Sequence, residues 1–317
     1  MPIPSLASAR LPERLGSYAA SSQVVGALRT AAAATGVSFE MLASKAAMES
    51  GLRADAQAPT SSARGLFQFI DQTWLGMVQQ HGAAHGLGTE AAAVVSGPGG
   101  RLTVQDPAER SRILALRDDP ETSARFAGEY LRGLSDSLTP VLGRRPDAAE
   151  LYLGHFLGAG GATKMLQAVA ADPGRTAASV LPAAAAANPR MFNGSDGQPL
   201  SVAQFAERVR GRLNRSYSEL GLVPPGGPMD FQPTAEAAVT RAVAGERGTW
   251  GNGTPARITH GAERAMLATL SKVFTRMSRG PGHAGQDDPP EAIPAAVLGA
   301  LRADAPAAGT APGTRSS

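Results

Sequence analysis

Two consecutive segments near the start of the chain share one pattern, in which a serine opens a run of apolar residues at helical spacing and a glycine closes it. The first runs from Ser21 and Ser22 to Gly36, and the second runs from Ser38 to Gly51. A serine side chain caps the free N–H groups of a helix, and a glycine readily adopts the left-handed conformation that ends one. Aromatic residues make up only 5% of the chain, whereas sheets favour aromatic and β-branched residues. We therefore predict an all-α fold.

Further helical patterns follow along the chain. One starts near Gly65 after a polar loop at residues 52–64, and a compact, amphipathic one covers residues 201–213. Between them, the glycine-rich residues 86–106 fit a small β-hairpin. The remaining helical patterns cover residues 107–116, 121–134, 148–157 and 162–170, with a linker or short helix at 181–187.

Breaker residues set the predicted domain boundaries. Residues 1–18 are punctuated by proline and serine, which predicts a flexible N-terminus. Residues 19–216 are predicted to form one catalytic domain. Residues 217–317 are rich in Pro, Gly and Ala, and we expect them to be largely disordered apart from one amphipathic helix near 262–277.

The amino-acid composition limits the kinds of catalytic site, metal site and partner that the chain can have. The chain has no cysteine, which excludes disulfides, thiolate catalysis and Cys-ligated zinc. His81 and His85 are four residues apart but flanked by glycines, so we interpret them as a helix end and expect no metal. The net charge of +3 suits an anionic partner. No block of Lys and Arg with interleaved aromatics is present, and we therefore expect no nucleic-acid partner.

The chain carries no recognisable targeting segment. Met1 to Ser5 is not a basic region followed by an apolar one, which a secretory signal requires. No apolar run approaches the ~20 residues that span a bilayer. We expect no transmembrane segment, and the route of any export stays open.

Glu49 lies on the apolar face of the second predicted helix, because it follows Phe39, Leu42 and Ala46 at helical spacing. Partial burial and the negative end of the helix dipole both disfavour a carboxylate, so we predict a raised pKa for Glu49. A carboxyl group that stays protonated near neutral pH can act as a general acid at a glycosidic oxygen. The alternative is a solvated glutamate that pairs with Lys45 one turn earlier.

The residues around this glutamate resemble a known family. After Glu49-Ser50 and an Ala/Ser-rich loop come Gly65-Leu66-Phe67-Gln68 and then Thr73-Trp74. This order is similar to that of the soluble lytic transglycosylases (SLT domains) of the goose-lysozyme-like superfamily, in particular a phage-like and alphaproteobacterial subgroup. Their pattern is a Glu-Ser pair, an Ala-x-Gly-Leu-Met-Gln block and a Thr-Trp pair. Here Phe67 replaces the methionine.

A third block of that family, Ala-Tyr-Asn-Ala-Gly, corresponds to residues 150–161 with a partial match. Phe156 stands where the family has a tyrosine, whose hydroxyl supports the catalytic acid. Tyr152, one helical turn earlier, could supply this support, and so could His155.

The resemblance implies a lysozyme-like helical catalytic domain that acts on peptidoglycan in the cell wall without a cofactor. Glu49 would protonate the oxygen between MurNAc and GlcNAc and then take the proton of the MurNAc 6-hydroxyl, which closes a 1,6-anhydro ring. The implied substrate-binding residues are Ser50, Gly65, Gln68, Tyr152 and His155. Gly65 would allow close approach of the chain above the cleft.

Two other functions are open. A muramidase on the same fold would use a second carboxylate, as glycosidases generally do. We consider Asp55, Asp71, Glu90 and Glu150 for that role; Asp71 is better explained as a helix N-cap, and none has a claim equal to that of Glu49. The other alternative is a non-catalytic cell-wall-binding component of a secretion, flagellar or phage-like assembly, docked through residues 217–317.

The aromatic residues Phe67, Phe69 and Trp74 are at helical spacing beside Ile70, and we assign them to the core.

Overall fold

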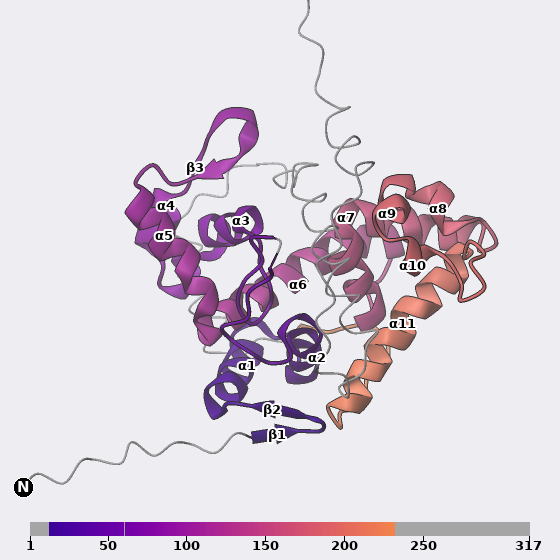
Figure 1. Cartoon of the computed structure of the whole chain (residues 1–317), viewed down its shortest axis with the longest axis horizontal. Helices are drawn as coiled ribbons and strands as arrows, with labels where there is room; N and C mark the ends of the chain where they lie inside the picture. Colours follow the sequence, from indigo (N-terminus) through magenta and orange to yellow (C-terminus); the bar gives the residue numbers. More distant parts are fainter. Residues whose placement is uncertain (1–12, 60, 232–317) are drawn as a thin grey trace, which may run out of the picture. The chain divides into compact units, whose positions relative to one another are not determined.

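The computed structural model describes residues 13–59 and 61–231, which are mostly helical (Figure 1). The predicted all-α class is confirmed, because the strands in this part form only two short hairpins. The helix predicted near 262–277 and the disorder predicted for the C-terminal extension lie outside the described residues. The α-helices are α1 (Ser22–Thr35), α2 (Phe39–Ser50), α3 (Asp71–His81), α4 (Gly88–Ala93), α5 (Pro107–Ala115), α6 (Pro120–Leu142), α7 (Ala148–Ala171), α8 (Ala177–Val180), α9 (Pro182–Ala187), α10 (Pro189–Phe192) and α11 (Val202–Glu219). The strands are β1 (Glu13–Leu15), β2 (Tyr18–Ala20), β3 (Val95–Ser96) and β4 (Leu102–Thr103), and the 3-10 helices are η1 (Ala83–His85), η2 (Pro98–Gly100) and η3 (Leu116–Asp118).

The first two helices begin and end where the sequence predicts. The Ser21 side chain accepts a hydrogen bond from a backbone N–H of the first turn of α1, and Gly36 ends the helix with φ 74°. Ser38 caps α2 in the same way, and Gly51 ends it with φ 63°. The left-handed φ of both glycines explains why a glycine stands at each stop.

The third helix begins later than predicted. The pattern indicated a helix from near Gly65, but α3 starts only at Asp71. Gly65 has φ 82° and Gln68 has φ 50°, and left-handed residues interrupt a right-handed helix. The prediction that Asp71 is the N-cap is also wrong. Ile70 occupies that position, and the Asp71 carboxylate accepts a hydrogen bond from Arg110 at 2.8 Å.

The predicted glycine-rich hairpin is confirmed. β3 pairs antiparallel with β4, with Val95 opposite Thr103. Its second strand is held to α3 by Gln72, whose side chain donates to the Leu102 carbonyl at 2.9 Å and accepts from the Leu102 N–H at 3.0 Å. The short helix α4 precedes the hairpin within the same glycine-rich segment.

Helices α1, α6 and α11 pack against α2, and α7 packs against α6 and α11. α6 packs against α1, α2, α3 and α7, while α11 packs against α7 and α2 (Figure 1). The two helical patterns predicted at 148–157 and 162–170 lie within α7, which is broken at Gly158 (φ 73°, ψ 164°). Ser201 caps the start of α11 and forms a reciprocal capping box with Gln204, and α11 continues to Glu219.

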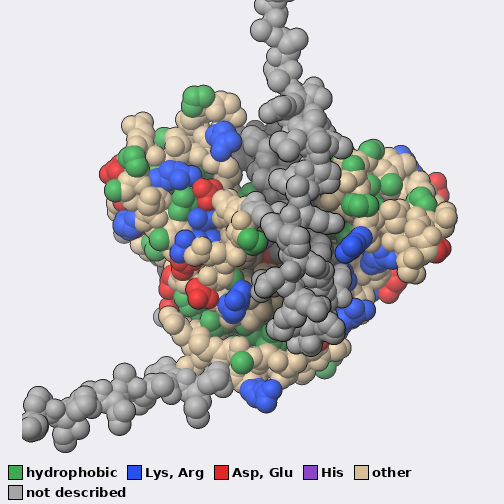
Figure 2. Space-filling model, viewed as in Figure 1, with side chains coloured by type: hydrophobic (Ala, Val, Ile, Leu, Met, Phe, Trp, Pro, Cys, Tyr) green, Lys and Arg blue, Asp and Glu red, His purple; other side chains and the backbone are tan. Residues whose placement is uncertain are grey.

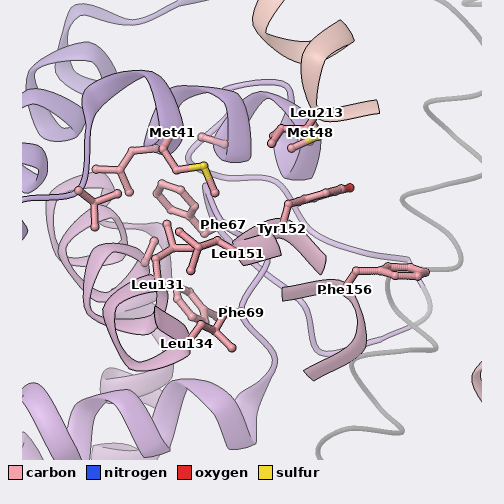
Figure 3. Close-up of a cluster of buried hydrophobic side chains, with 14 of the residues drawn as sticks. Met41, Met48, Phe67, Phe69, Leu131, Leu134, Leu151, Tyr152, Phe156 and Leu213 are labelled. Atoms are coloured by element: carbon pink, nitrogen blue, oxygen red, sulfur yellow. The ribbon is translucent and has the colours of Figure 1, made fainter. Parts of the chain in front are cut away.

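The core lies where these helices meet the segment before α3. Figure 3 shows side chains from α2, from residues 65–70, and from α6, α7 and α11 in this cluster. The prediction that Phe67, Phe69 and Trp74 are core residues is confirmed, since each is buried. The indole N–H of Trp74 donates to the Ile113 carbonyl at 2.7 Å, which satisfies the one polar group of this ring.

Residues 13–18, the end of the segment predicted to be flexible, are ordered, and the rest of that segment lies outside the described residues. β1 and β2 pair as a hairpin. The Ser17 backbone N–H donates to the Glu219 carbonyl at 2.8 Å, and the Tyr18 hydroxyl donates to the Glu219 carboxylate at 3.0 Å. These bonds attach the short hairpin to the end of α11.

Packed residues continue after α11. Met229 and Phe231 are both buried, and the Met229 N–H donates to the Pro146 carbonyl at 2.9 Å. The core therefore uses residues beyond position 216, the predicted end of the domain.

Charged side chains are spread over the surface. On the face in Figure 2, Lys and Arg side chains lie both on the side of α3 to α5 and on the side of α7 to α11. Several are paired: Arg112 contacts Glu90 and Glu109, and Arg144 contacts Glu150. Positive charge is thus not gathered into one patch on this face.

Gly65 provides a test of this fold. A Cβ at Gly65 would lie 1.9 Å from the Arg117 carbonyl oxygen, whereas one at Gly143, with φ 66°, would meet nothing within 4 Å. We expect Gly143→Ala to lower the free energy of unfolding by about 1–2 kcal/mol, the cost of a left-handed non-glycine residue. Gly65→Ala should lower it by a further ~1–3 kcal/mol because of the overlap. Urea denaturation of both variants measures the difference, and equal losses would contradict this account of Gly65.

Candidate active site

Glu49 lies in the last turn of α2, one residue before the helix ends at Ser50. Its side chain is only 4% exposed. The predicted apolar face is confirmed, since Leu42 and Ala46 on the same side are fully buried. The carboxylate is therefore held inside the protein.

Two side chains contact this carboxylate. Lys45 Nζ lies 3.3 Å from Glu49 Oε1, and His155 Nε2 lies 2.5 Å from the same oxygen. Lys45 Nζ is also 2.8 Å from His155 Nε2 and 3.1 Å from His155 Nδ1. The Lys45 side chain is 2% exposed and that of His155 is 10% exposed. We call these three residues the buried triad.

Both contacts use one oxygen of the carboxylate. Oε1 faces Lys45 and His155, while Oε2 has no hydrogen-bond partner in the described part of the chain. The carboxylate is thus anchored on one side and keeps one oxygen for another partner.

The predicted rise in the pKa of Glu49 is wrong. Burial does raise this pKa, but the charge of Lys45, the charge of His155 and their hydrogen bonds together outweigh burial and lower it to about 2. The prediction of a raised pKa was based on burial and on the helix dipole, and pairing of Glu49 with Lys45 was considered only as an alternative to burial. In the fold the two occur together, so Glu49 is ionised at neutral pH.

The partners of Glu49 are shifted as well. Burial lowers the pKa of Lys45, and the Glu49 charge opposes that change. Burial and then the Lys45 charge lower the pKa of His155. Lys45 and Glu49 thus form an ion pair at 3.3 Å, with the His155 ring in contact with both.

A second set of side chains surrounds the triad. Tyr152 is buried on α7, and its hydroxyl is hydrogen-bonded to Arg212 of α11. Burial raises the pKa of Tyr152 to about 12; Arg212 opposes this rise, and the charge of Glu49 adds to it. The Tyr130 ring meets the His155 ring edge-on at 6.0 Å between centroids. Of the two predicted supports for the acid, His155 thus contacts Glu49 directly, and Tyr152 lies beside it.

Sequence reasoning missed Tyr130 and Arg212 and gave Lys45 too little weight. The spacing of four residues between Lys45 and Glu49 could have indicated a pair inside the core. No spacing relates Tyr130 or Arg212 to Glu49, because only packing of α6 and α11 around α2 and α7 brings them near.

Ser50 joins the end of α2 to the second motif block. Its hydroxyl lies 2.8 Å from the Leu66 carbonyl oxygen and 3.0 Å from the Ala46 carbonyl oxygen, and it is 8% exposed. A substrate-binding role was predicted for Ser50, but here its donor serves the backbone. The bond to Leu66 places the turn at residues 65–68 beside Glu49.

That turn is held by its own residues. Gly65 gives the close approach that was predicted, but the approach is to the Arg117 carbonyl of this chain rather than to a sugar. The Gln68 side chain donates to the carbonyls of Ala56 and Gly65 at 3.0 and 2.9 Å. Its amide N–H groups therefore position the turn, where contact with Glu49 or a sugar was predicted.

Phe156, which stands at the tyrosine position of the family, faces the core. Its ring centroid is 6.3 Å from that of Phe205 on α11. The same α7 turn presents His155 to Glu49. A helix break at Gly158 follows, so the triad lies just before the point where α7 changes direction.

The other candidate carboxylates have different partners. Asp71 pairs with Arg110 and Arg117, and Glu90 pairs with Arg112. Glu150 completes the capping box of α7 and contacts Arg144. Asp55 is exposed in the loop after α2. Among the described residues, only Lys45 and His155 are hydrogen-bonded to the Glu49 carboxylate, and neither is acidic.

His81 and His85 both face Glu129 of α6. The His85 Nε2 to Glu129 Oε1 distance is 2.9 Å, and the His81 Nδ1 to Glu129 Oε2 distance is 3.9 Å. Within residues 13–59 and 61–231, no group of three His, Cys, Asp or Glu side chains has a geometry that could hold a metal ion.

A comparison of the chain with protein-family models finds no match. In the same described ranges, none of the helices combines the length and apolarity needed to cross a membrane. The resemblance to lytic transglycosylases therefore stays a prediction that rests on the motif residues.

The interaction between the buried charges of Lys45 and Glu49 can be tested by measuring protein stability. Glu49→Gln leaves the Lys45 ammonium buried without its counter-charge, and we expect a loss of about 3–5 kcal/mol in the free energy of unfolding at neutral pH. Lys45→Met combined with Glu49→Gln removes both charges and should recover most of that loss. Chemical denaturation of the wild type, both single variants and the double variant measures this cycle. Additive losses would mean that the two charges do not interact.

The pH dependence of stability tests the same pair. The pKa of Glu49 is about 2 in the folded protein against 4.5 for a free glutamate. The folded state thus favours the ionised form, and this contribution is present above pH 4.5 and is lost as the pH falls toward 2. We expect the stability difference between wild type and Glu49→Gln to shrink in that window. A difference that grows on acidification would show that the pKa of Glu49 is raised.

Proposed function

We propose that the protein is a peptidoglycan lytic transglycosylase in which Glu49 is the single acid/base. One observation carries this proposal: residues from three separate sequence blocks meet at one buried carboxylate. Glu49 and Ser50 come from the first block, and the Ser50 bond to Leu66 brings in the second. His155 brings in the third through its 2.5 Å contact with Glu49.

The architecture supports a lysozyme-like catalytic domain. The described part is mostly helical, and its acidic residue stands in the last turn of a helix surrounded by three others. Such a frame holds a carboxylate in a fixed position, which acid/base catalysis requires. The lysozyme-like fold itself is part of this proposal.

The geometry suits a group that first gives and later takes one proton. Lys45 and His155 fix Oε1, so Oε2 is the oxygen that would meet the glycan. In its acid form Glu49 gives a proton to the oxygen between MurNAc and GlcNAc, and the bond from that oxygen to MurNAc C1 breaks. The resulting carboxylate takes the proton of the MurNAc 6-hydroxyl as that oxygen bonds to C1. The product is a 1,6-anhydro-MurNAc end, and no water is consumed.

The acidic residues favour this lyase reaction over hydrolysis. A conventional glycosidase needs two carboxylates at a defined separation. Asp71, Glu90 and Glu150 are each engaged in ion pairs with arginines, and Asp55 is exposed in the loop after α2. Glu49 has only Lys45 and His155 as polar contacts in the described part of the chain.

The roles of the other motif residues change accordingly. Ser50, Gly65 and Gln68 make contacts with the backbone of this chain, and we assign them to positioning the 65–68 turn beside Glu49. Tyr152 and His155 surround the carboxylate from α7. Peptidoglycan is the proposed partner, and the cell wall is the proposed place of action.

Product analysis tests the proposal. Purified peptidoglycan is digested with the wild-type protein, and the released muropeptides are identified by mass spectrometry. We expect 1,6-anhydro-MurNAc ends. Glu49→Gln should lower the rate by about 10²–10⁴, the usual contribution of a general acid/base. The more stable double variant with Lys45→Met should be equally inactive.

Glu90→Gln is the matched control, because Glu90 pairs with Arg112 away from the triad, and its activity should equal that of the wild type. Reducing-end MurNAc among the products would instead identify a muramidase. Absence of any release by the folded wild-type protein would favour the non-catalytic cell-wall-binding component. Full activity of Glu49→Gln would refute the role of Glu49.

A further inference from the structure

Lys45 is an ammonium group inside the protein. Its side chain is 2% exposed, and it comes from the same helix as Glu49. Removing an ammonium group from water costs several kcal/mol unless charge and hydrogen bonds compensate for it. Lys45 finds that compensation in the Glu49 carboxylate at 3.3 Å and in the His155 ring. The buried lysine therefore contacts the carboxylate that carries out the proposed reaction.

The proposed reaction needs a proton on Glu49, and the resting triad has none there. The ionised carboxylate must therefore receive a proton before the glycosidic bond breaks. Once a glycan covers Oε2, this proton must come from a group of the protein that contacts Glu49 through Oε1.

The groups around the triad can be compared one by one. Arg212 is bonded to Tyr152 and keeps its proton at any pH that proteins tolerate. Tyr152 and Tyr130 would become phenolate anions if they gave up a proton. A neutral imidazole at His155 would become an anion as well. Among the groups that can release a proton, Lys45 alone becomes neutral when it does so.

Resting on the proposed function, we infer that Lys45 is the reservoir of the proton that Glu49 delivers to the glycosidic oxygen. The proton resides on Lys45 Nζ in the resting protein. It passes to Glu49 Oε1, either directly across 3.3 Å or through His155 Nε2, which lies 2.8 Å from Nζ and 2.5 Å from Oε1. Lys45 acts through Glu49 and does not touch the glycan.

The protons balance over the cycle. An N–H bond of Lys45 breaks and an O–H bond of Glu49 forms, which leaves a neutral amine and a neutral acid. Glu49 then gives its proton to the leaving GlcNAc oxygen and regains one from the MurNAc 6-hydroxyl. That proton returns to Lys45. The triad starts and ends with the same number of protons.

Burial provides the driving force for the first step. A neutral amine and acid cost less to keep out of water than two ions do. A glycan that covers Oε2 removes the remaining water contact and so favours the neutral pair. Rotation about the terminal side-chain torsion of Glu49, which is broad and two-fold for carboxyl groups, presents the protonated oxygen to the glycan.

Two substitutions of Lys45 separate this role from a structural one. Lys45→Arg keeps the positive charge, but the guanidinium does not release its proton. We expect kcat for anhydro-muropeptide release to fall about 10²-fold or more, with KM little changed. A lysine that only held Glu49 in place would be replaced well by arginine, and kcat would then stay near that of the wild type.

Lys45→Met gives the second readout, in the pH profile. Without the ammonium, burial raises the pKa of Glu49, so the glutamate carries its own proton at acidic pH and loses it as the pH rises. We expect measurable turnover near pH 5 and a drop of about tenfold or more by pH 8. In the wild type, activity persists until Lys45 itself loses its proton. The alkaline limb of the profile should therefore move to lower pH in Lys45→Met.

The outcomes distinguish the two proposals. Wild-type release of anhydro products, together with a shifted alkaline limb in Lys45→Met and a low kcat in Lys45→Arg, supports the reservoir. An active wild type with an unshifted limb in Lys45→Met overturns the reservoir and leaves the proposed function standing. The pH profile of Lys45→Met does not depend on whether the Lys45→Arg variant, with its bulkier side chain, folds. A wild type that is silent on peptidoglycan overturns both.

Discussion

The structure depends on a charged pair buried along one helix. Lys45 and Glu49 face inward from α2, and a helix with two inward charges is stable only if other elements enclose and satisfy them. α7 supplies His155 to both. α6 and α11 close the surroundings, and a bond between the hydroxyls of Ser44 and Ser216 joins α2 to α11 at 3.0 Å. These contacts enclose the pair and satisfy its hydrogen bonds.

A second buried charge organises the segment before α3. The Arg117 guanidinium donates to the Ser62, Phe69 and Leu114 carbonyls, and it contacts Asp71 at 2.9 Å. The backbone of the same residue passes so close to the 65–68 turn that only glycine fits there. Gly65 and Gln68, which the motif resemblance assigns to substrate binding, thus have a structural role here, because they hold the 65–68 turn in place beside the carboxylate.

Local signals in the sequence predicted local structure well. Ser21, Ser38 and Ser201 begin helices, and Gly36 and Gly51 end them, because capping involves only neighbouring residues. The site was predicted in part: Glu49 and His155 follow from the motif blocks, whereas Arg212 and Tyr130 depend on packing between distant helices. The pKa error has the same origin. Helix spacing reveals that a carboxylate is buried, but the sign of its shift depends on what is buried with it.

The sequence distance between partners in the core has a consequence for synthesis. Lys45 meets His155 across 110 residues, and Ser44 meets Ser216 across 172. At about 5–20 residues per second on the ribosome, α2 waits roughly 10–30 s for α11 to be made. During that interval the enclosure of its two charges is incomplete, because α7 is made before α11. The N-terminal helices therefore cannot reach their final packing during translation, and this domain completes its fold only after α11 has emerged.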